Sequence, residues 1–216
     1  MPSNFDAVLE EGTLQARGRK SGWLARTVTW SAWALLLAPL TILLHELGHL
    51  VAALILGVPQ PELHFSHLSH GDLSGTPSWV LGVVGFTGPA ITIGLMLLGI
   101  YWVHQKRTSA WAFGLVFAAA SRLFVAVPHT IVTSIRWLRD ERLSEAGFDE
   151  YKAAVAFGWP GNLPLVFTSL FFIASMIWLG RSLQRGHRSS AWIGLIAGTI
   201  AGWSLWMIVL GPLVLP

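Results

Sequence analysis

The 216-residue sequence contains no cysteine and few charged residues. Without cysteine, disulfide bonds, thiolate metal ligands and a cysteine nucleophile are all excluded. Charged residues make up 12% of the chain, which is about half of the ~25% usual in soluble domains. This composition argues against a soluble globular protein.

Apolar residues are abundant instead. They make up 53% of the chain, which also contains twelve tryptophans, whose indole rings favour the membrane–water boundary. Five apolar runs approach or exceed the ~20 residues that a helix needs to cross a bilayer. We therefore predict an all-α polytopic integral membrane protein with about five transmembrane helices, embedded in the lipid bilayer of the cell membrane. The spans are expected at about 23–58, 79–103, 110–135, 163–179 and 191–210.

The runs divide the chain into three regions. Residues 1–22 are polar and are expected to form a loose tail, residues 23–162 to form the core, and residues 163–216 to supply the last two transmembrane helices. The net charge of +3 does not indicate a nucleic-acid partner, because the basic residues lie in short loops between spans. Nine Lys or Arg residues on the side of the N-terminus, against four on the other, favour a cytoplasmic N-terminus. The sequence does not determine an oligomeric state.

Two connections are longer than simple turns. Residues 59–78 are rich in Pro, Gly, Ser and His and are expected to form a short β-hairpin or re-entrant loop after the first span. Residues 136–162 begin highly charged and then become amphipathic. A short helix is predicted there over residues 150–157, ended by Gly158, with Asp149 able to cap its N-terminus.

The sequence HELGH, residues 45–49, lies inside the first apolar run. On a helix, His45 and His49 share a face, so both imidazoles can reach one ion. Zinc accepts two imidazoles and a carboxylate oxygen and keeps a fourth position for water, whose pKa it lowers towards ~7. Glu46 would take the proton of that water and pass it to the leaving amine. The motif predicts one Zn²⁺ ion and a catalytic Glu46; the alternative, a structural polar patch, is costly in a membrane.

This motif, placed in the first apolar helix, resembles the site-2 protease family of intramembrane zinc metalloproteases. A second match, GFTGPAITIG at residues 85–94, resembles the family's Gly-Pro element through Gly88 and Pro89. The family's asparagine a few residues later is absent, and Thr92 is a weak substitute for its substrate-positioning role. From the residues alone, a Gly-Pro pair frees a carbonyl and suits a cavity wall, or it kinks the helix for packing only.

The third metal ligand is less determined than the first two. One branch of the family has an aspartate followed by a short helix that ends in Gly-x-Pro, and FDEYKAAVAFGWP at residues 148–160 resembles this arrangement. The resemblance implies that His45, His49 and Asp149 hold the metal. The chemistry of zinc alone also leaves other ligands open, namely Asp140, Glu150, Asp72 and His129.

Other polar residues are candidates for a role in or near the predicted metal site. Arg122 and His129 lie seven residues apart in the third span and would share a face of a continuous helix. They could stabilise an oxyanion or hold a substrate carbonyl; alternatively, Arg122 pairs with an acidic group or extends to the interface, and His129 is packed. His64, His67 and His70 are expected to lie in a solvated loop, with metal binding as the alternative.

These features predict an intramembrane zinc metalloendopeptidase. Its substrates would be transmembrane or membrane-adjacent segments of other membrane proteins, cleaved by metal-activated water. An extended substrate could add as a strand to the hairpin region at residues 59–78. The alternative class is a non-proteolytic membrane protein, either a zinc-binding scaffold or a small transporter whose intramembrane polar residues line a pathway.

Overall fold

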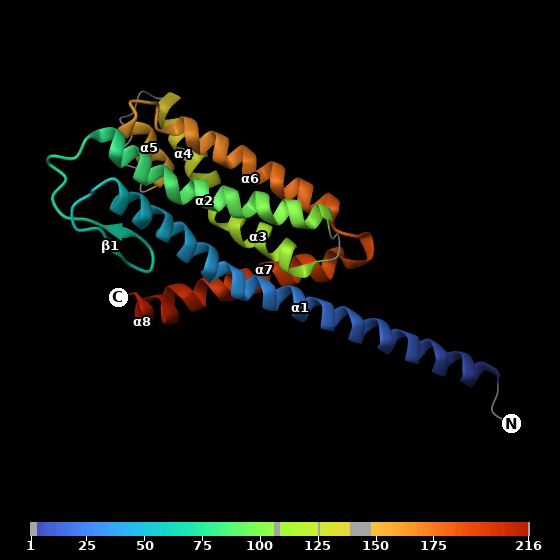
Figure 1. The fold of residues 1–216 in the computed structure, drawn as a ribbon. Helices are drawn as coiled ribbons and strands as arrows, with labels where there is room; N and C mark the ends of the chain where they lie inside the picture. The colour runs from blue at the N-terminus through green and yellow to red at the C-terminus, as the bar shows by residue number, and fades with distance from the viewer. Residues whose placement is uncertain (1–3, 106–108, 125, 139–147, 216) are drawn as a thin grey trace.

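The computed structural model describes residues 4–105, 109–124, 126–138 and 148–215. The long helices lie side by side, and a small β-hairpin and the short helix α5 lie at the same end of the bundle (Figure 1). The helices are α1 (Asn4–Ile55), α2 (Ser78–Gln105), α3 (Ala110–Phe124), α4 (Ala126–Leu138), α5 (Asp149–Ala156), α6 (Asn162–Ser182), α7 (Arg188–Leu205) and α8 (Gly211–Val214), with a 3₁₀ turn at Arg185–His187 and a π-helical turn at Trp206–Leu210.

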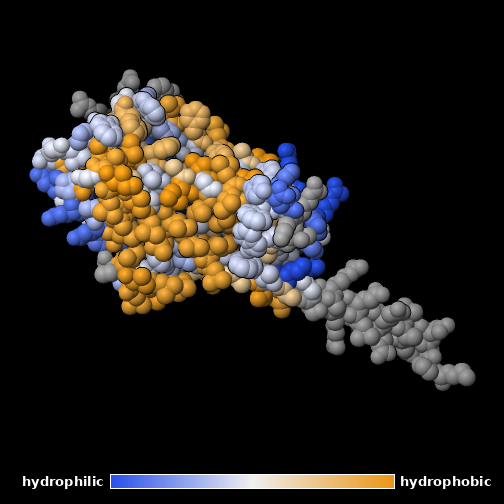
Figure 2. All heavy atoms as spheres, viewed as in Figure 1, coloured by the Kyte–Doolittle hydropathy of each residue, from blue (hydrophilic) through white to orange (hydrophobic). Residues whose placement is uncertain are grey.

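The chain is an all-α polytopic membrane protein, as predicted. Figure 2 shows a broad hydrophobic surface on the visible face of the bundle, with hydrophilic surfaces at its two ends. Two candidate spans separate residues 56–77 from residues 148–161, so the two segments lie on the same side of a bilayer. Five helical segments are long and apolar enough to cross it: Gly22–Ile55, Ser78–Gln105, Ala110–Arg136, Asn162–Ser182 and Arg185–Val214.

One expectation about helix continuity is wrong. Helix α1 begins at Asn4, so the polar N-terminal segment continues the first transmembrane helix and is not a loose tail. Its Ala, Leu, Glu, Gln, Arg and Lys residues are strong helix formers, and they extend a helix that is already nucleated. In the third span the structure describes α3, up to Phe124, and α4, from Ala126, and residue 125 lies outside the described residues. The segment Ala110–Arg136 is long and apolar enough to form one span, as predicted.

The main apolar core lies around the first half of α3. Phe113 and Val116 are fully buried there, against Met96 of α2 and Leu195 of α7. Helix α7 packs closely on α1, because Gly194, Gly198 and Gly202 present a side-chain-free stripe to it. This packing fixes α1, α2 and α3 relative to one another, and these three helices supply most of the site described below.

The predicted β-hairpin is present. Strands β1 (Glu62–Leu63) and β2 (Leu68–Ser69) pair antiparallel, with Leu63 opposite Leu68. The last span holds the turn between the strands, because the indole Nε1–H of Trp206 donates to the carbonyl of Phe65 at 2.8 Å. Figure 1 shows the C-terminal end of the chain close to the hairpin. The hairpin is therefore tied to the bundle at the end where α5 also lies.

Candidate metal centre

Helices α1 and α2 pack closely enough for α2 to touch the histidines of α1. Gly48 provides the space on α1: a Cβ atom there would lie 2.9 Å from the side chain of Ile91 and 3.3 Å from the carbonyl oxygen of Thr87. His45 and His49 are both buried, at 2% and 4% exposure. Because they lie one turn apart on a helix that is fixed by this contact, both rings point to the same place between α1 and α2.

A stripe of α2 orients the two rings. Val84, Gly88 and Thr92 are spaced by four residues, so they share one helix face. His49 Nδ1–H donates to the carbonyl of Val84 at 2.7 Å. His45 Nδ1 lies 2.8 Å from the Thr92 hydroxyl. That hydroxyl donates to the carbonyl of Gly88 at 3.3 Å, and it is therefore free to accept the proton of His45 Nδ1. Both rings thus turn their Nε2 lone pairs towards a common point.

Gly88 is the position at which the rings approach α2 most closely. A Cβ atom there would lie 2.6 Å from His45 Nε2 and would also collide with His49 Nε2. Pro89 is fully buried and lies beside this contact. Because proline has no N–H, it leaves the carbonyl of Gly85 without its helical donor, and Gly85 lines the cavity described below. Gly88 and Pro89 therefore shape the site, and neither contributes a side-chain polar group to it.

Helix α5 brings the carboxylate of Asp149 to the two imidazoles. Gly85 of α2 lets α5 approach, since a Cβ atom there would lie 3.3 Å from the side chain of Ala153 and 3.4 Å from the carbonyl of Asp149. Asp149 is the first residue of α5; the N-cap position belongs to Phe148, and no side chain caps the helix. The predicted capping role of Asp149 is wrong, because its carboxylate is directed to the histidines. As predicted, α5 ends before Gly158, whose positive φ of 75° reverses the backbone.

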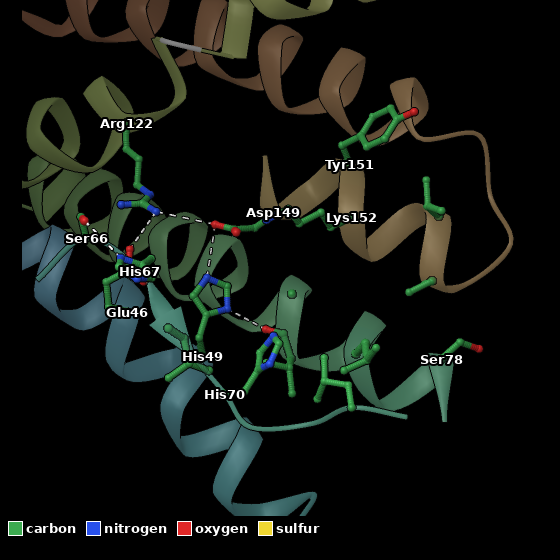
Figure 3. A pocket seen from close by; sticks show the side chains of 17 residues that line it. Glu46, His49, Ser66, His67, His70, Ser78, Arg122, Asp149, Tyr151 and Lys152 are labelled. Carbon is green, nitrogen blue, oxygen red and sulfur yellow. Dashed lines mark hydrogen bonds and ion pairs between the residues drawn. The ribbon is translucent and has the colours of Figure 1, made fainter. Parts of the chain in front are cut away.

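The three ligand atoms lie close together. His45 Nε2 and His49 Nε2 are 3.0 Å apart, and Asp149 Oδ2 lies 3.2 Å and 3.3 Å from them (Figure 3 shows His49 and Asp149). Ligands ~2.0–2.1 Å from a tetrahedral zinc ion would lie roughly 3.3 Å from one another. The distances between the ligand atoms therefore match those around one small cation. The residues His45, His49 and Asp149 could hold a metal ion.

The chemistry of the donors also fits a cation. The carbonyl of Val84 can only accept, so a neutral His49 carries its proton on Nδ1 and turns a lone pair towards Asp149. Burial alone raises the pKa of Asp149, but the two imidazoles beside it outweigh burial and hold that pKa below its ordinary value. The site thus gathers two ring lone pairs and an ionised carboxylate. A metal ion between the three groups would accept both ring lone pairs and balance the charge of the carboxylate. Without a metal ion, one of the three groups has to carry an additional proton.

Glu46 lies beside this cluster and is paired with Arg122 of α3. The guanidinium Nη2 is 3.1 Å from Glu46 Oε1 and 3.7 Å from Asp149 Oδ2, so Arg122 bridges the two carboxylates (Figure 3). The side chain of Glu46 is 3% exposed and that of Arg122 is 24% exposed. Pairing with an acidic group was one of the expectations for Arg122. The ion pair with Glu46 holds Arg122 in the site.

Other residues considered as ligands are not part of the cluster. Glu150 is buried, which raises its pKa. Asp72 is exposed, and hydrogen bonds from Ser74 lower the pKa of its carboxyl. His129 packs its ring against that of Phe148, with the ring centroids 4.6 Å apart. Asp140 lies outside the described residues.

A cavity of about 780 Å³ opens beside the cluster. Its walls come from α1, α2 and α5, from Arg122 of α3, and from the hairpin strand β2 with its flanking residues (Figure 3). His67 and His70 of the hairpin line it, while His64 and His67 stack on each other at 4.7 Å. Across the described residues, these hairpin histidines form no metal-binding group of three. The cavity makes Glu46, His49 and Asp149 accessible from the hairpin end.

Comparisons of the chain with protein-family models, with curated proteins and with solved structures found no match. The function therefore has to be argued from the site itself.

Sequence reasoning missed several residues that build the site. The carbonyl of Val84 and the close contact at Gly85 were not identified, and Thr92 was considered only as a substitute for an asparagine. The sequence did contain a pattern that points to them. Val84, Gly88 and Thr92 are spaced by four residues, as are His45 and His49 on the helix that packs against them. The partner of Arg122 had no comparable signal, since it depends on how α3 lies against α1.

Proposed function

We propose that this protein is an intramembrane zinc metalloendopeptidase. The observation that carries the proposal is the convergence of His45, His49 and Asp149 on one point, with Glu46 beside it at the wall of a cavity. Two imidazoles and one carboxylate are a ligand set that zinc uses in catalytic sites, where a fourth position stays open. The similarity of the motifs to the site-2 protease family points in the same direction.

The roles of the residues follow from their positions. A zinc ion held by His45, His49 and Asp149 would supply an acidified water and polarise a peptide carbonyl. Glu46 adjoins the first ligand in the chain and reaches the cavity, so it is placed to take a proton from the attacking water. The same carboxyl then delivers that proton to the nitrogen of the leaving amine. Val84 and Thr92 keep the two rings in the tautomer that this chemistry needs.

Arg122 has two tasks in this proposal. Its pairing with Glu46 fixes the orientation of a carboxylate that would otherwise be a lone buried charge. Its guanidinium also lines the cavity, where it can donate to a carbonyl oxygen as negative charge develops on it. Donating to substrate would loosen the contact with Glu46 at the stage when Glu46 has to accept a proton.

The position of the site favours cleavage near one membrane surface. His49 lies six residues before the end of α1 at Ile55, which corresponds to about 9 Å along the helix. Two walls of the cavity, the hairpin and α5, lie outside the five candidate spans. We therefore propose that the substrate is a membrane-adjacent segment, or the end of a transmembrane segment, of another membrane protein.

A Glu46→Gln substitution tests this mechanism. The amide cannot take the proton, so cleavage of membrane-anchored peptides in vesicles should fall by on the order of 10²–10⁴-fold. The peptides would be detected by mass spectrometry and the bound metal by elemental analysis. The variant should still bind one zinc ion per chain, since Glu46 is not a ligand. Glu62→Gln, on the exposed strand β1, is the matched control and should cleave normally.

The same measurements separate the alternative classes. Full cleavage by the Glu46→Gln variant would overturn the proposed mechanism. Zinc bound at one ion per chain, with no peptide cleaved by the unmodified protein, would favour a metal-binding scaffold. Zinc or proton flux into vesicles containing the protein would favour a transporter.

A further inference from the structure

The charged residues around the cavity are not equally engaged. Among the described residues, four with a formal charge line it, and three of them belong to the metal centre: Asp149 contacts both histidines, and Glu46 and Arg122 pair with each other. The fourth is Lys152, which is exposed and has no ion pair within the described part of the chain. The uncommitted charge of the cavity wall is therefore positive.

Lys152 lies close to the metal centre. It follows Asp149 by three residues on α5, so the two side chains are neighbours on one helix face, with Cβ atoms about 5–6 Å apart. Figure 3 shows Lys152 next to Asp149 among the lining residues. An extended peptide advances about 3.3 Å per residue. A group bound at Lys152 would therefore lie within about two residues of the bond that faces the metal centre.

As far as the structure describes the chain, the opposite wall adds no acidic group. The hairpin contributes Ser66, His67, Leu68 and His70, and the N-terminal part of α2 contributes neutral residues. A partly enclosed cavity also weakens the screening of its charges by water. An anionic group that enters the cavity can therefore pair with Lys152, whereas a cationic group is repelled by it.

We infer that Lys152 forms a subsite for an acidic side chain of the substrate, an Asp or Glu within about two residues of the cleaved bond. This inference rests on the proposed peptidase function. It adds a preference for acidic sequences to that function, and the preference is set by a residue that is neither a metal ligand nor a proton carrier. A peptide carboxylate is favoured over a lipid phosphate because Lys152 faces the cavity that contains the metal centre.

The test measures binding, so it does not depend on cleavage. The full-length protein as purified would be placed in nanodiscs of zwitterionic lipid and titrated on ice with fluorescent peptides that differ only in one Glu or Gln. We expect the Glu peptide to bind about fivefold more tightly, the size of a modest interfacial charge pair. Lys152→Gln should abolish the difference and Lys152→Glu should reverse it. Arg136→Gln, an exposed cation on α4, is the control and should leave the ratio unchanged.

Three results would overturn the inference. The first is equal affinity of the unmodified protein for the two peptides, and the second is a preference that survives in Lys152→Gln. The third is an effect of Lys152 only on binding to vesicles with anionic lipid, which would identify a lipid phosphate as the ligand. The outcomes also separate the two proposals: a charge preference without cleavage leaves the subsite standing, and cleavage without a charge preference leaves the peptidase standing.

Discussion

Two groups of histidines lie at the same end of this protein, and they differ in what surrounds them. His45 and His49 are buried on α1, and each has a fixed partner for its Nδ1 atom on α2. His67 and His70 are carried by the hairpin, at the outer wall of the same cavity. Within the part of the chain that the structure describes, only the first pair is joined by a carboxylate to form a group that could hold a metal.

This difference shows that the presence of histidines is not sufficient to form a metal-binding site. A helix of fixed geometry places two rings one turn apart, and hydrogen bonds to the far side of each ring select the tautomer and orientation. The hairpin supplies neither condition, because its histidines lie in the turn between the strands or just after β2 and contact one another or nearby backbone and serine groups. Metal affinity should therefore depend on His45 and His49 and on the groups of α2 that contact their Nδ1 atoms.

The largest effect is expected when a ligand is removed. His45→Ala or His49→Ala should weaken zinc binding by more than the ~10–100-fold typical for loss of an outer-shell partner. His67→Ala and His70→Ala are the matched controls and should leave zinc affinity unchanged. Zinc affinity would be measured by competition with a chelator on purified protein in detergent. If a hairpin substitution lowered affinity as much as His45→Ala, the assignment of the metal centre would be wrong.

A somewhat smaller effect is expected from Gly88→Ala. The new methyl group would collide with the Nε2 atoms of His45 and His49, so at least one ring has to move. Zinc affinity should fall by about 100-fold, near the upper end for changes outside the ligands themselves. Gly94→Ala is the control on the same helix, because a Cβ atom at Gly94 meets nothing within 4 Å. Similar zinc affinities in the two variants would show that the close approach of the His45 and His49 rings to Gly88 is not needed for metal binding.

The smallest effect is expected from Thr92→Val, which keeps the shape of the side chain and removes the hydroxyl that contacts His45 Nδ1. Zinc affinity should fall by about tenfold, as for other outer-shell partners. Thr92→Ser retains the hydroxyl and should preserve affinity. An equal loss in both variants would mean that packing of the Thr92 methyl group, and not the hydrogen bond, positions the ring.

Several features were predicted from the sequence because they depend on local properties. The five spans follow from the length of apolar runs, and the pairing of His45 with His49 follows from helical periodicity. The helical N-terminal segment was missed, because the polarity of a segment does not exclude a helix.

The sequence by itself determined the membrane architecture, the two histidines that could hold a metal ion and the adjacent Glu46, since each depends on residues within one helix. The tertiary structure decided the rest of the site. Asp149, 100 residues after His49, reaches the cluster because Gly85 lets α5 approach α2. Arg122 reaches Glu46 because α3 packs against α1. Contacts of this kind depend on how closely helices pack, and that distance is set by the side chains of both partners together.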